Sequence, residues 1–358
     1  MSNENNSSLV SIVILNYNGQ SCLEDCLNSV LETKYPNFEV ILVDNASKDN
    51  SLKIAQEAFG SDPRLKIVKN QINVGFSGGN NIGYDYSKGE YIVFLNNDTI
   101  VDQNWLDSLV SAMQNDPSIG LAQSMILNID GDRIQTAGWL FSNYLLHKYP
   151  LCKDKPSNTK FKPVFEVSFA CGASMMIKRE VTEKMGVFDP KMPFFYDDTL
   201  LSLKTWLAQK RVVTVSESKI RHIGGATNVW NIKFTTYHLL KSNICLLFDI
   251  YPRLTDLAKA LFINAFSTSI NSMFCLKNKN VAAVLGSFHA LTWSLKNFSY
   301  IWQNRLNHWS NARVSPEKLK EKFVRIKLPF HFCVMPSKSG AHYFAQTVGK
   351  IENALMQE

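Results

Sequence analysis

Residues 94–101 read FLNNDTIV, in which three polar side chains directly follow an apolar run. The apolar run, residues 91–95 (YIVFL), has the length and composition of a strand that is buried on both faces. Asn96, Asn97 and Asp98 then stand where such a strand would end. A turn is one interpretation, because Asn and Asp favour turns by hydrogen-bonding their own backbone. A metal or phosphate site at the end of the strand is the other.

The sequence before this stretch alternates strand and helix patterns. Residues 11–15, 39–43 and 65–68 are short apolar runs, and residues 22–31 and 51–59 between them carry apolar side chains at helical spacing. This alternation predicts right-handed crossovers and an α/β fold with a mostly parallel central sheet. Ligands bind such sheets at the carboxyl ends of the strands, so the polar residues after each strand are the candidates for a site.

All four predicted strands end in amides, carboxylates or glycines. These ends are residues 16–19 (NYNG), 44–49 (DNASKD), 73–81 (NVGFSGGNN) and 96–98 (NND). We expect them to converge on one crevice, which turn chemistry alone would not require. A Gly-x-Gly-x-x-Gly after the first strand would have indicated a dinucleotide-dependent oxidoreductase. Only Gly19 stands there, so this class of enzyme is disfavoured.

The composition is that of a globular protein, with 45% hydrophobic and 19% charged residues in a chain of 358. Its seven cysteines are scattered, and Cys22 and Cys26 lack the companion ligands of a zinc site. We therefore expect reduced thiols, as in the cytosol. Residues 1–8 are polar and predicted to be disordered, without the pattern of a secretory signal. Together these features predict a cytoplasmic protein.

The charge is divided unevenly along the chain. Residues 231–358 hold 16 Lys and Arg against 6 Asp and Glu, which leaves 22 against 25 for residues 1–230. The later part is helical and apolar in pattern, but its uncharged run, residues 281–295, is short for a bilayer span. It is either a pair of helices lying on an anionic membrane surface or an ordinary helical subdomain. It lacks the features of a nucleic-acid-binding module, so nucleic acid is not an expected partner.

Five segments in order along the chain resemble glycosyltransferase family 2, which has the GT-A nucleotide-sugar fold. They are VSIVILNYNG, VDNASKDNS, NVGFSGGNN, FLNNDT and GVFDPKMPFFYDD. The NxGFxxGNN loop is most similar to the rhamnosyltransferase-like branch. The resemblance covers roughly residues 9–226 and implies a catalytic domain over residues 9–230, followed by a helical extension over 231–358. It also implies an inverting transfer from a UDP- or dTDP-sugar to a hydroxyl of a glycan or lipid-linked acceptor, in cell-surface polysaccharide synthesis.

The resemblance implies a divalent cation, Mg²⁺ or Mn²⁺, at Asp98. Negative charge grows on a nucleotide diphosphate as its bond to the sugar breaks, and a cation held by oxygen ligands stabilises that charge. The Asp-x-Asp motif of the family stands here as Asn96-Asn97-Asp98, so only Asp98 is a charged ligand. His222 matches a family histidine that reaches the metal or the diphosphate.

The resemblance also implies a set of donor-binding residues. Asp44 matches the aspartate that binds the base and ribose, although a helix N-cap is an alternative role for it. Glycines permit close approach of the backbone to the diphosphate or sugar, although a glycine-rich turn before a helix would look the same. The full predicted set is Asn16, Asn18, Asp44, Asn73, Gly75, Gly78, Gly79, Asn80, Asn97, Gly172 and Ala173.

The resemblance further implies that Asp198, supported by Asp197, is the general base. An inverting displacement needs a carboxylate that takes the proton of the acceptor hydroxyl, and apolar neighbours and a second carboxylate raise its pKa towards a useful range. An acidic N-cap for a helix over residues 200–208 is the alternative. Leu200 replaces a carboxylate of the family pattern. With Asn96, it is the basis of a second hypothesis, a non-catalytic sugar-nucleotide-binding subunit of a polysaccharide assembly complex.

Overall fold

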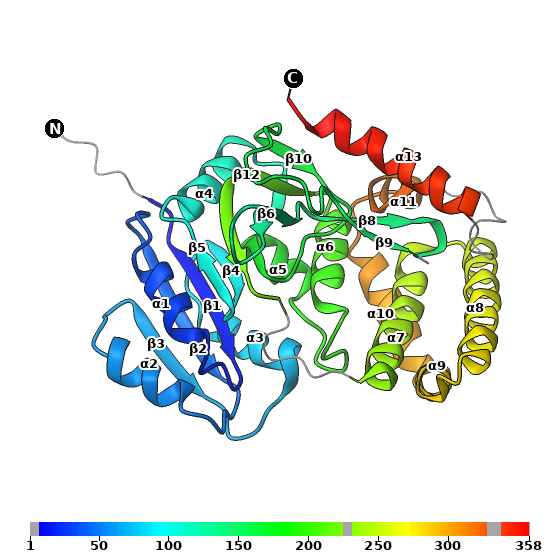
Figure 1. Cartoon of the computed structure of the whole chain (residues 1–358), viewed down its shortest axis with the longest axis horizontal. Helices are drawn as coiled ribbons and strands as arrows, with labels where there is room; N and C mark the ends of the chain where they lie inside the picture. Colours follow the sequence, from blue (N-terminus) through cyan, green and yellow to red (C-terminus); the bar gives the residue numbers. More distant parts are fainter. Residues whose placement is uncertain (1–6, 146, 225–230, 328–337, 358) are drawn as a thin grey trace.

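A computed structural model describes residues 7–145, 147–224, 231–327 and 338–357 (Figure 1). Residues 1–6, most of the stretch predicted to be disordered, therefore lie outside the described residues. The described cysteines are free thiols, as expected, and Cys333 lies outside the described residues.

The four strands that the sequence predicts form a parallel sheet. In the sheet β1 lies between β2 and β4, and β3 pairs with β2. The register places Asn16 opposite Asp44 and Leu15 opposite Asn96, so the polar strand ends lie side by side. The elements are β1 (Val10–Asn16), α1 (Leu23–Leu31), β2 (Phe38–Asp44), α2 (Ser51–Phe59), β3 (Leu65–Lys69), α3 (Gly75–Tyr86) and β4 (Tyr91–Asn96).

The second half of the sheet mixes strand directions. Its strand order continues from β4 through β11, β6 and β12 to β10, with β11 antiparallel to both of its neighbours. The elements are β5 (Thr99–Val101), α4 (Trp105–Asn115), β6 (Ile119–Leu127), β7 (Ile134–Thr136), β10 (Val164–Glu166), β11 (Ser174–Lys178), α5 (Arg179–Met185), α6 (Asp197–Leu207) and β12 (Arg211–His222). The result is the α/β fold that the sequence predicts.

Two glycines of α3 allow this helix to pack directly on the sheet. A Cβ added at Gly79 would lie 2.3 Å from Cδ1 of Leu15, and one added at Gly83 would lie 2.2 Å from Cγ1 of Val13. Both contacts are far shorter than atoms tolerate, so side chains at these positions would push α3 away from β1. This packing holds the start of α3 beside the end of β1.

The helical extension packs on the far side of the molecule from β1–β3 (Figure 1). It shares one hydrophobic cluster with the sheet, in which Leu246 and Phe323 lie with Phe141 and Leu203. The division at residue 230 remains a prediction, but the core is continuous across it. The remaining elements are β8 (Trp139–Ser142), η1 (Asn143–Leu145), β9 (Lys148–Pro150), α7 (Ile232–Ile250), α8 (Leu254–Lys277), α9 (Val281–Lys296), α10 (Phe298–Ser310), α11 (Pro316–Phe323), β13 (Val324–Ile326) and α13 (Lys338–Leu355).

None of the helices in the described ranges combines the length and the hydropathy that crossing a bilayer requires.

Candidate active site

A cavity of about 560 Å³ opens at the carboxyl ends of the parallel strands. Asp98 and Asp198, which are a hundred residues apart in the sequence, both line it. None of the described residues in its lining is a lysine or an arginine. The lining consists of Leu15, Tyr17, Asn45, Asn73, Gly75, Phe76, Asn96, Asn97, Asp98, Cys171, Gly172, Ala173, Phe194, Phe195, Asp197, Asp198 and His222.

Asn16 ties the ends of three strands together behind the cavity. Its amide nitrogen donates to Oδ1 of Asp44 at 3.1 Å and to Oγ of Ser51 at 2.9 Å. Its amide oxygen accepts from Nδ2 of Asn97 at 2.9 Å. Asn16 is fully buried, so these bonds are made without competition from water. They fix Asn97 in place at the cavity and hold the carboxylate of Asp44.

A second amide network shapes the loop before α3. Nδ2 of Asn45 donates to Oδ1 of Asn73 at 2.9 Å, and the same oxygen of Asn73 accepts from the backbone nitrogen of Gly75 at 2.9 Å. Gly75 has a φ of +78°, a left-handed conformation that glycine adopts without strain. A Cβ there would also lie 2.8 Å from Cβ of Pro193. Asn73 and Gly75 therefore line the cavity in a fixed backbone geometry, as their prediction as donor-binding residues requires.

Asp98 and His222 form the most compact polar pair in the cavity. Oδ1 of Asp98 lies 3.1 Å from Nε2 of His222, and both side chains are largely buried. His222 is the last residue of β12, and Asp98 follows β4 in the turn before β5. Nδ1 of His222 lies 2.7 Å from Oε1 of Gln135, which can only accept, so Nδ1 carries a proton. Nε2 is thus directed at the carboxylate of Asp98.

Asp197 and Asp198 are the first two residues of α6, and both line the cavity. Burial, and then the neighbouring carboxylate of Asp198, raise the pKa of Asp197 to about 7. Asp198 also acts at the helix N-terminus, since its Oδ1 accepts from the backbone nitrogen of Thr199 at 2.6 Å. Phe195, two residues earlier, has a φ of +61°, a conformation that costs free energy for a residue with a Cβ. The N-cap alternative is wrong, because Asp197 and Asp198 are the first two residues of α6 and its N-cap residue is Tyr196, without a side-chain cap hydrogen bond.

The predicted site residues divide into two groups by position. Those that line the cavity are Asn73, Gly75, Asn97, Asp98, Gly172, Ala173, Asp197, Asp198 and His222. Gly172 lies under the carboxylates, where a Cβ would stand 3.6 Å from Oδ2 of Asp197. The turn interpretation of residues 96–98 is also correct, because Asn97 and Asp98 form a turn that lines the cavity.

The other predicted site residues lie outside the lining. Asn16 and Asp44 are buried behind it, and Asn18 accepts from the backbone nitrogen of Lys48 at 2.8 Å. Gly79 packs on Leu15, and Asn80 donates to the backbone oxygen of Phe76 at 3.0 Å. Gly78 also lies within α3, where a Cβ would stand 3.1 Å from Cγ2 of Val74. The structure thus gives these residues packing and positioning contacts. Gly78, Gly79 and Asn80 make such contacts because α3 already begins at Gly75 and includes them.

Asn45 in the lining, and Gln135 and Lys148 outside it, were not among the predicted site residues. Asn45 links β2 to the loop of Asn73, although its signal, an amide after a strand, was present in the sequence. Gln135 orients His222 from a segment with no sequence signal. Burial lowers the pKa of Lys148, and the carboxylates of Asp198 and Asp197 act in the opposite direction. Lys148 is therefore close enough to the pair to sense its charge.

The fold is that of a class of solved enzymes, the GT-A glycosyltransferases. The structure of GalNAc-T7 with UDP, GalNAc and Mn²⁺ is similar with a TM-score of 0.61 and 19% identity, over 90% of this chain and 57% of that one. The structure of S. aureus TarS 1-349 in complex with UDP-GlcNAc is similar with a TM-score of 0.51 and 16% identity, over 87% and 91%. At these identities the likeness concerns the fold.

The sequence comparison gives the family. Residues 11–186 match the model described as Glycosyl transferase family 2. This match and the curated glycosyltransferase relatives support glycosyltransferase family 2, the family that the five segments indicated.

Curated relatives carry names from the same field. The chain is 28% identical to an uncharacterized glycosyltransferase of Haemophilus influenzae, over 40% of this chain and 46% of the relative. It is 29% identical to the O-antigen biosynthesis protein RfbC of Myxococcus xanthus, over 60% and 17%. It is 34% identical to the Escherichia coli UDP-Glc:alpha-D-GlcNAc-diphosphoundecaprenol beta-1,3-glucosyltransferase WfgD, over 29% and 41%. The chain thus spans less than half the length of each of these relatives.

Proposed function

We propose that this glycosyltransferase is an inverting enzyme that moves a sugar from a UDP- or dTDP-linked donor to a hydroxyl of a glycan or lipid-linked acceptor. The observation that carries the proposal is the convergence of Asp98 with His222 and of Asp197 with Asp198 on one cavity. A displacement of this kind needs stabilisation of the leaving diphosphate at one place and a base at another. Two separate acidic groups in one cavity supply both.

The donor is proposed to lie along the strand ends and the loop of Asn73 and Gly75. Their backbone and amide groups are fixed by hydrogen bonds with one another, so they are preorganised for a polar ligand. A nucleotide diphosphate is the ligand class that the names of WfgD and the TarS complex contain. The likeness to the rhamnosyltransferase-like branch adds dTDP-sugars to the candidate donors.

Asp98 and His222 are the residues proposed to hold a divalent cation. The pair suits such an ion, because a histidine nitrogen and a carboxylate oxygen are both metal-ligand types, and these two atoms lie 3.1 Å apart on residues of the cavity lining. The described residues offer no cluster of three or more His, Cys, Asp or Glu for a metal, so phosphate oxygens and water would complete the coordination. The bound ion would supply positive charge beside the diphosphate, which no lysine or arginine of the described lining provides.

Asp198 is proposed as the general base, with Asp197 beside it in a supporting role. The acceptor oxygen attacks the anomeric carbon as the bond from that carbon to the diphosphate oxygen breaks, and the carboxylate takes the hydroxyl proton. The position of Asp198 in the cavity lining, beside Asp197 at the start of α6, supports this role. The names of RfbC and WfgD place those relatives in O-antigen synthesis and in transfer to a diphosphoundecaprenol-linked sugar. A role in cell-surface polysaccharide synthesis follows by analogy, and the cytoplasmic location stays a prediction.

A donor screen tests the proposal. The full chain is incubated with a panel of UDP- and dTDP-sugars, with Mn²⁺, with Mg²⁺ or with a chelator, and released nucleotide is measured. We expect metal-dependent release from at least one donor. Binding of UDP in calorimetry without turnover of any donor, with or without sugar acceptors, would instead support the non-catalytic binding subunit.

A further inference from the structure

The helix α9 has an inverted distribution of side-chain size. Its buried face consists of small residues, including Ala283, Gly286 and Ala290. Gly286 meets the backbone of α7, where an added Cβ would lie 2.6 Å from the backbone oxygen of Lys233. The opposite face carries large apolar side chains at helical spacing. Leu295, the most exposed of them, is 77% exposed. Helices of soluble proteins place such side chains inward.

The neighbouring helix α8 continues this pattern. Phe262 and Phe266 are 66% and 43% exposed, and their rings stack on each other at a centroid distance of 6.3 Å. Met273 and Phe274, two turns further along, are 70% and 64% exposed. A patch of this kind on a soluble monomer marks an interaction surface. We call the exposed apolar side chains of α8 and α9 together the outer face.

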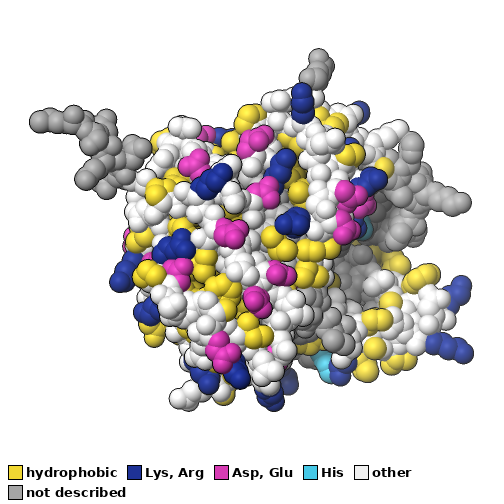
Figure 2. Space-filling view, turned by 60° about the vertical axis from the view of Figure 1, so that its left-hand side comes forward, with side chains coloured by type: hydrophobic (Ala, Val, Ile, Leu, Met, Phe, Trp, Pro, Cys, Tyr) yellow, Lys and Arg dark blue, Asp and Glu magenta, His cyan; other side chains and the backbone are white. Residues whose placement is uncertain are grey.

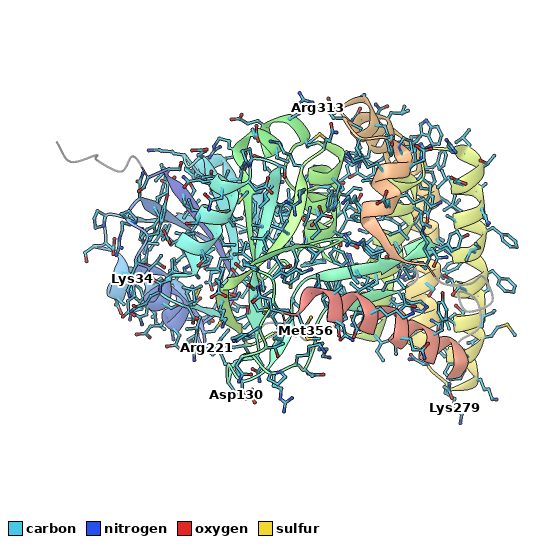
Figure 3. All side chains as sticks on the ribbon, turned by 90° about the horizontal axis from the view of Figure 1, so that it is seen from above. Lys34, Asp130, Arg221, Lys279, Arg313 and Met356 are labelled. Atoms are coloured by element: carbon cyan, nitrogen blue, oxygen red, sulfur yellow. The ribbon has the colours of Figure 1, made fainter. Side chains whose placement is uncertain are left out.

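The charge around the outer face is predominantly positive. Residues 253–298 contain Arg253 and four lysines, with Asp256 as the single acidic residue. Lys277 and Lys279 stand at the end of α8, and Lys279 marks a corner of the molecule in Figure 3. Figure 2 shows hydrophobic side chains along a lobe of the molecule that ends in Lys or Arg side chains.

One helix connects the outer face to the active site. α7 packs on α9 at Gly286, and its residues Phe234 and His238 contact Phe194 of the cavity lining, with ring centroids 5.5 and 5.4 Å apart. Phe194 stands in the segment that leads to Asp197 and Asp198. A surface bound by the outer face would therefore be separated from Phe194 of the cavity lining by two packed helices, α9 and α7.

We infer that the outer face docks on an anionic lipid bilayer. Apolar side chains enter the acyl boundary while flanking lysines meet anionic headgroups, which is the pattern of helices that lie in an interface. A second copy of the chain fits less well, because it would bring the same excess of positive charge to the contact. The inference rests on the proposed function in one respect, since it places a lipid-linked acceptor beside the cavity.

Vesicle co-sedimentation of the full chain tests the docking surface. The vesicles are phosphatidylcholine alone or phosphatidylcholine with roughly one-third phosphatidylglycerol, at low and high salt. We expect binding to the anionic vesicles at least about tenfold tighter than to the neutral ones, and weaker at high salt. The double variant Phe288→Asp with Leu295→Asp should lose at least about tenfold in this binding.

Two controls make the result decisive. Ile129→Asp changes an exposed apolar residue outside the helical extension and should leave vesicle binding unchanged. UDP calorimetry and thermal melts on each variant show that the site and the fold persist. The inference is overturned if the wild-type protein does not bind anionic vesicles. It is also overturned if the wild-type protein self-associates and the double variant does not. If UDP does not bind while vesicles do, the proposed function fails and the docking surface stands.

Discussion

The two walls of the cavity are built in different ways. One wall, formed by the ends of β1, β2 and β4, consists of amides that hydrogen-bond one another, with Asn16 and Asn45 at the centres. The other wall, formed by α6 and the residues before β11, presents the carboxylates of Asp197 and Asp198 over Gly172. Amides do not titrate, whereas two carboxylates close together do. We therefore expect the first wall to govern binding and the second to govern rate and its pH dependence.

Asp198→Asn should break the second wall with the largest effect. The amide cannot take the proton of an acceptor hydroxyl, so kcat should fall by about 10³. The shape of the side chain is kept, so UDP binding measured by calorimetry should change less than about threefold. Asp25→Asn, an exposed carboxylate of α1, is the matched control and should leave both unchanged. An Asp198→Asn enzyme with wild-type kcat would remove Asp198 from the reaction.

Asp98→Ala tests the junction between the walls and should cost about 10² in kcat/KM, because one charged ligand for the cation is lost. The metal dependence of UDP binding should disappear in the same variant.

His222→Gln should have a smaller effect on kcat/KM, of about tenfold, since the amide oxygen of Gln can replace a nitrogen ligand in part. Initial rates give kcat/KM for both variants, and titration of UDP with and without Mn²⁺ gives the metal dependence of binding. Unchanged metal dependence in Asp98→Ala would place the cation elsewhere.

Asn16→Ala should weaken the first wall without touching the second. It removes the partner of Oδ1 of Asp44 and of Nδ2 of Asn97, so the free energy of unfolding should fall by about 2 kcal/mol. KM for the donor should rise more than kcat falls, because Asn97 loses its support. Asn28→Ala, an exposed amide of α1, is the control for urea unfolding. A variant that loses kcat alone would contradict the division of the walls.

Asp197→Asn should show the smallest effect, and one that depends on pH. The carboxyl titrates near 3.8 when it is unperturbed and near 7 in the fold, so between these values the folded state holds a proton that the unfolded state has lost. The stability of the wild type therefore falls as pH rises through this window. The variant should gain stability relative to wild type as pH rises from about 4 to about 7, and gain nothing below about pH 4. Calorimetric melting at both pH values measures the difference in stability between variant and wild type. An equal difference at the two pH values would contradict the raised pKa of Asp197.

The sequence alone was sufficient for the elements of the first half and for their order. The four apolar runs became β1–β4, and the helical patterns became α1 and α2. A buried strand needs a continuous apolar run and an exposed end needs polar residues, so both features are local. The same logic predicted that Asn73, Asn97 and Asp98 would meet at one crevice, because the carboxyl ends of parallel strands share one edge of the sheet, whereas Asp198 was predicted from the resemblance to the family.

The sequence pattern could not distinguish residues that contact a ligand from residues that position another side chain. The sequence grouped Asn16, Asp44, Gly79 and Asn80 with the ligand contacts, and the structure places them behind the cavity or on α3. Gln135 and Lys148 were not predicted, since their segments reach the site only through the pairing of β7 with β6 and β9 with β8. An amide after a strand looks the same in sequence whether it faces a ligand or another amide.

The order of the strands, the family and the residues available for chemistry were thus determined by the sequence of this protein. The tertiary structure decided which of those residues reach the cavity, and which face of α9 stays uncovered. A helical periodicity marks an apolar face but does not say whether a neighbour covers it. On α9 the small residues met α7, because only Gly286 and its neighbours allow close approach, and the large ones remained outside.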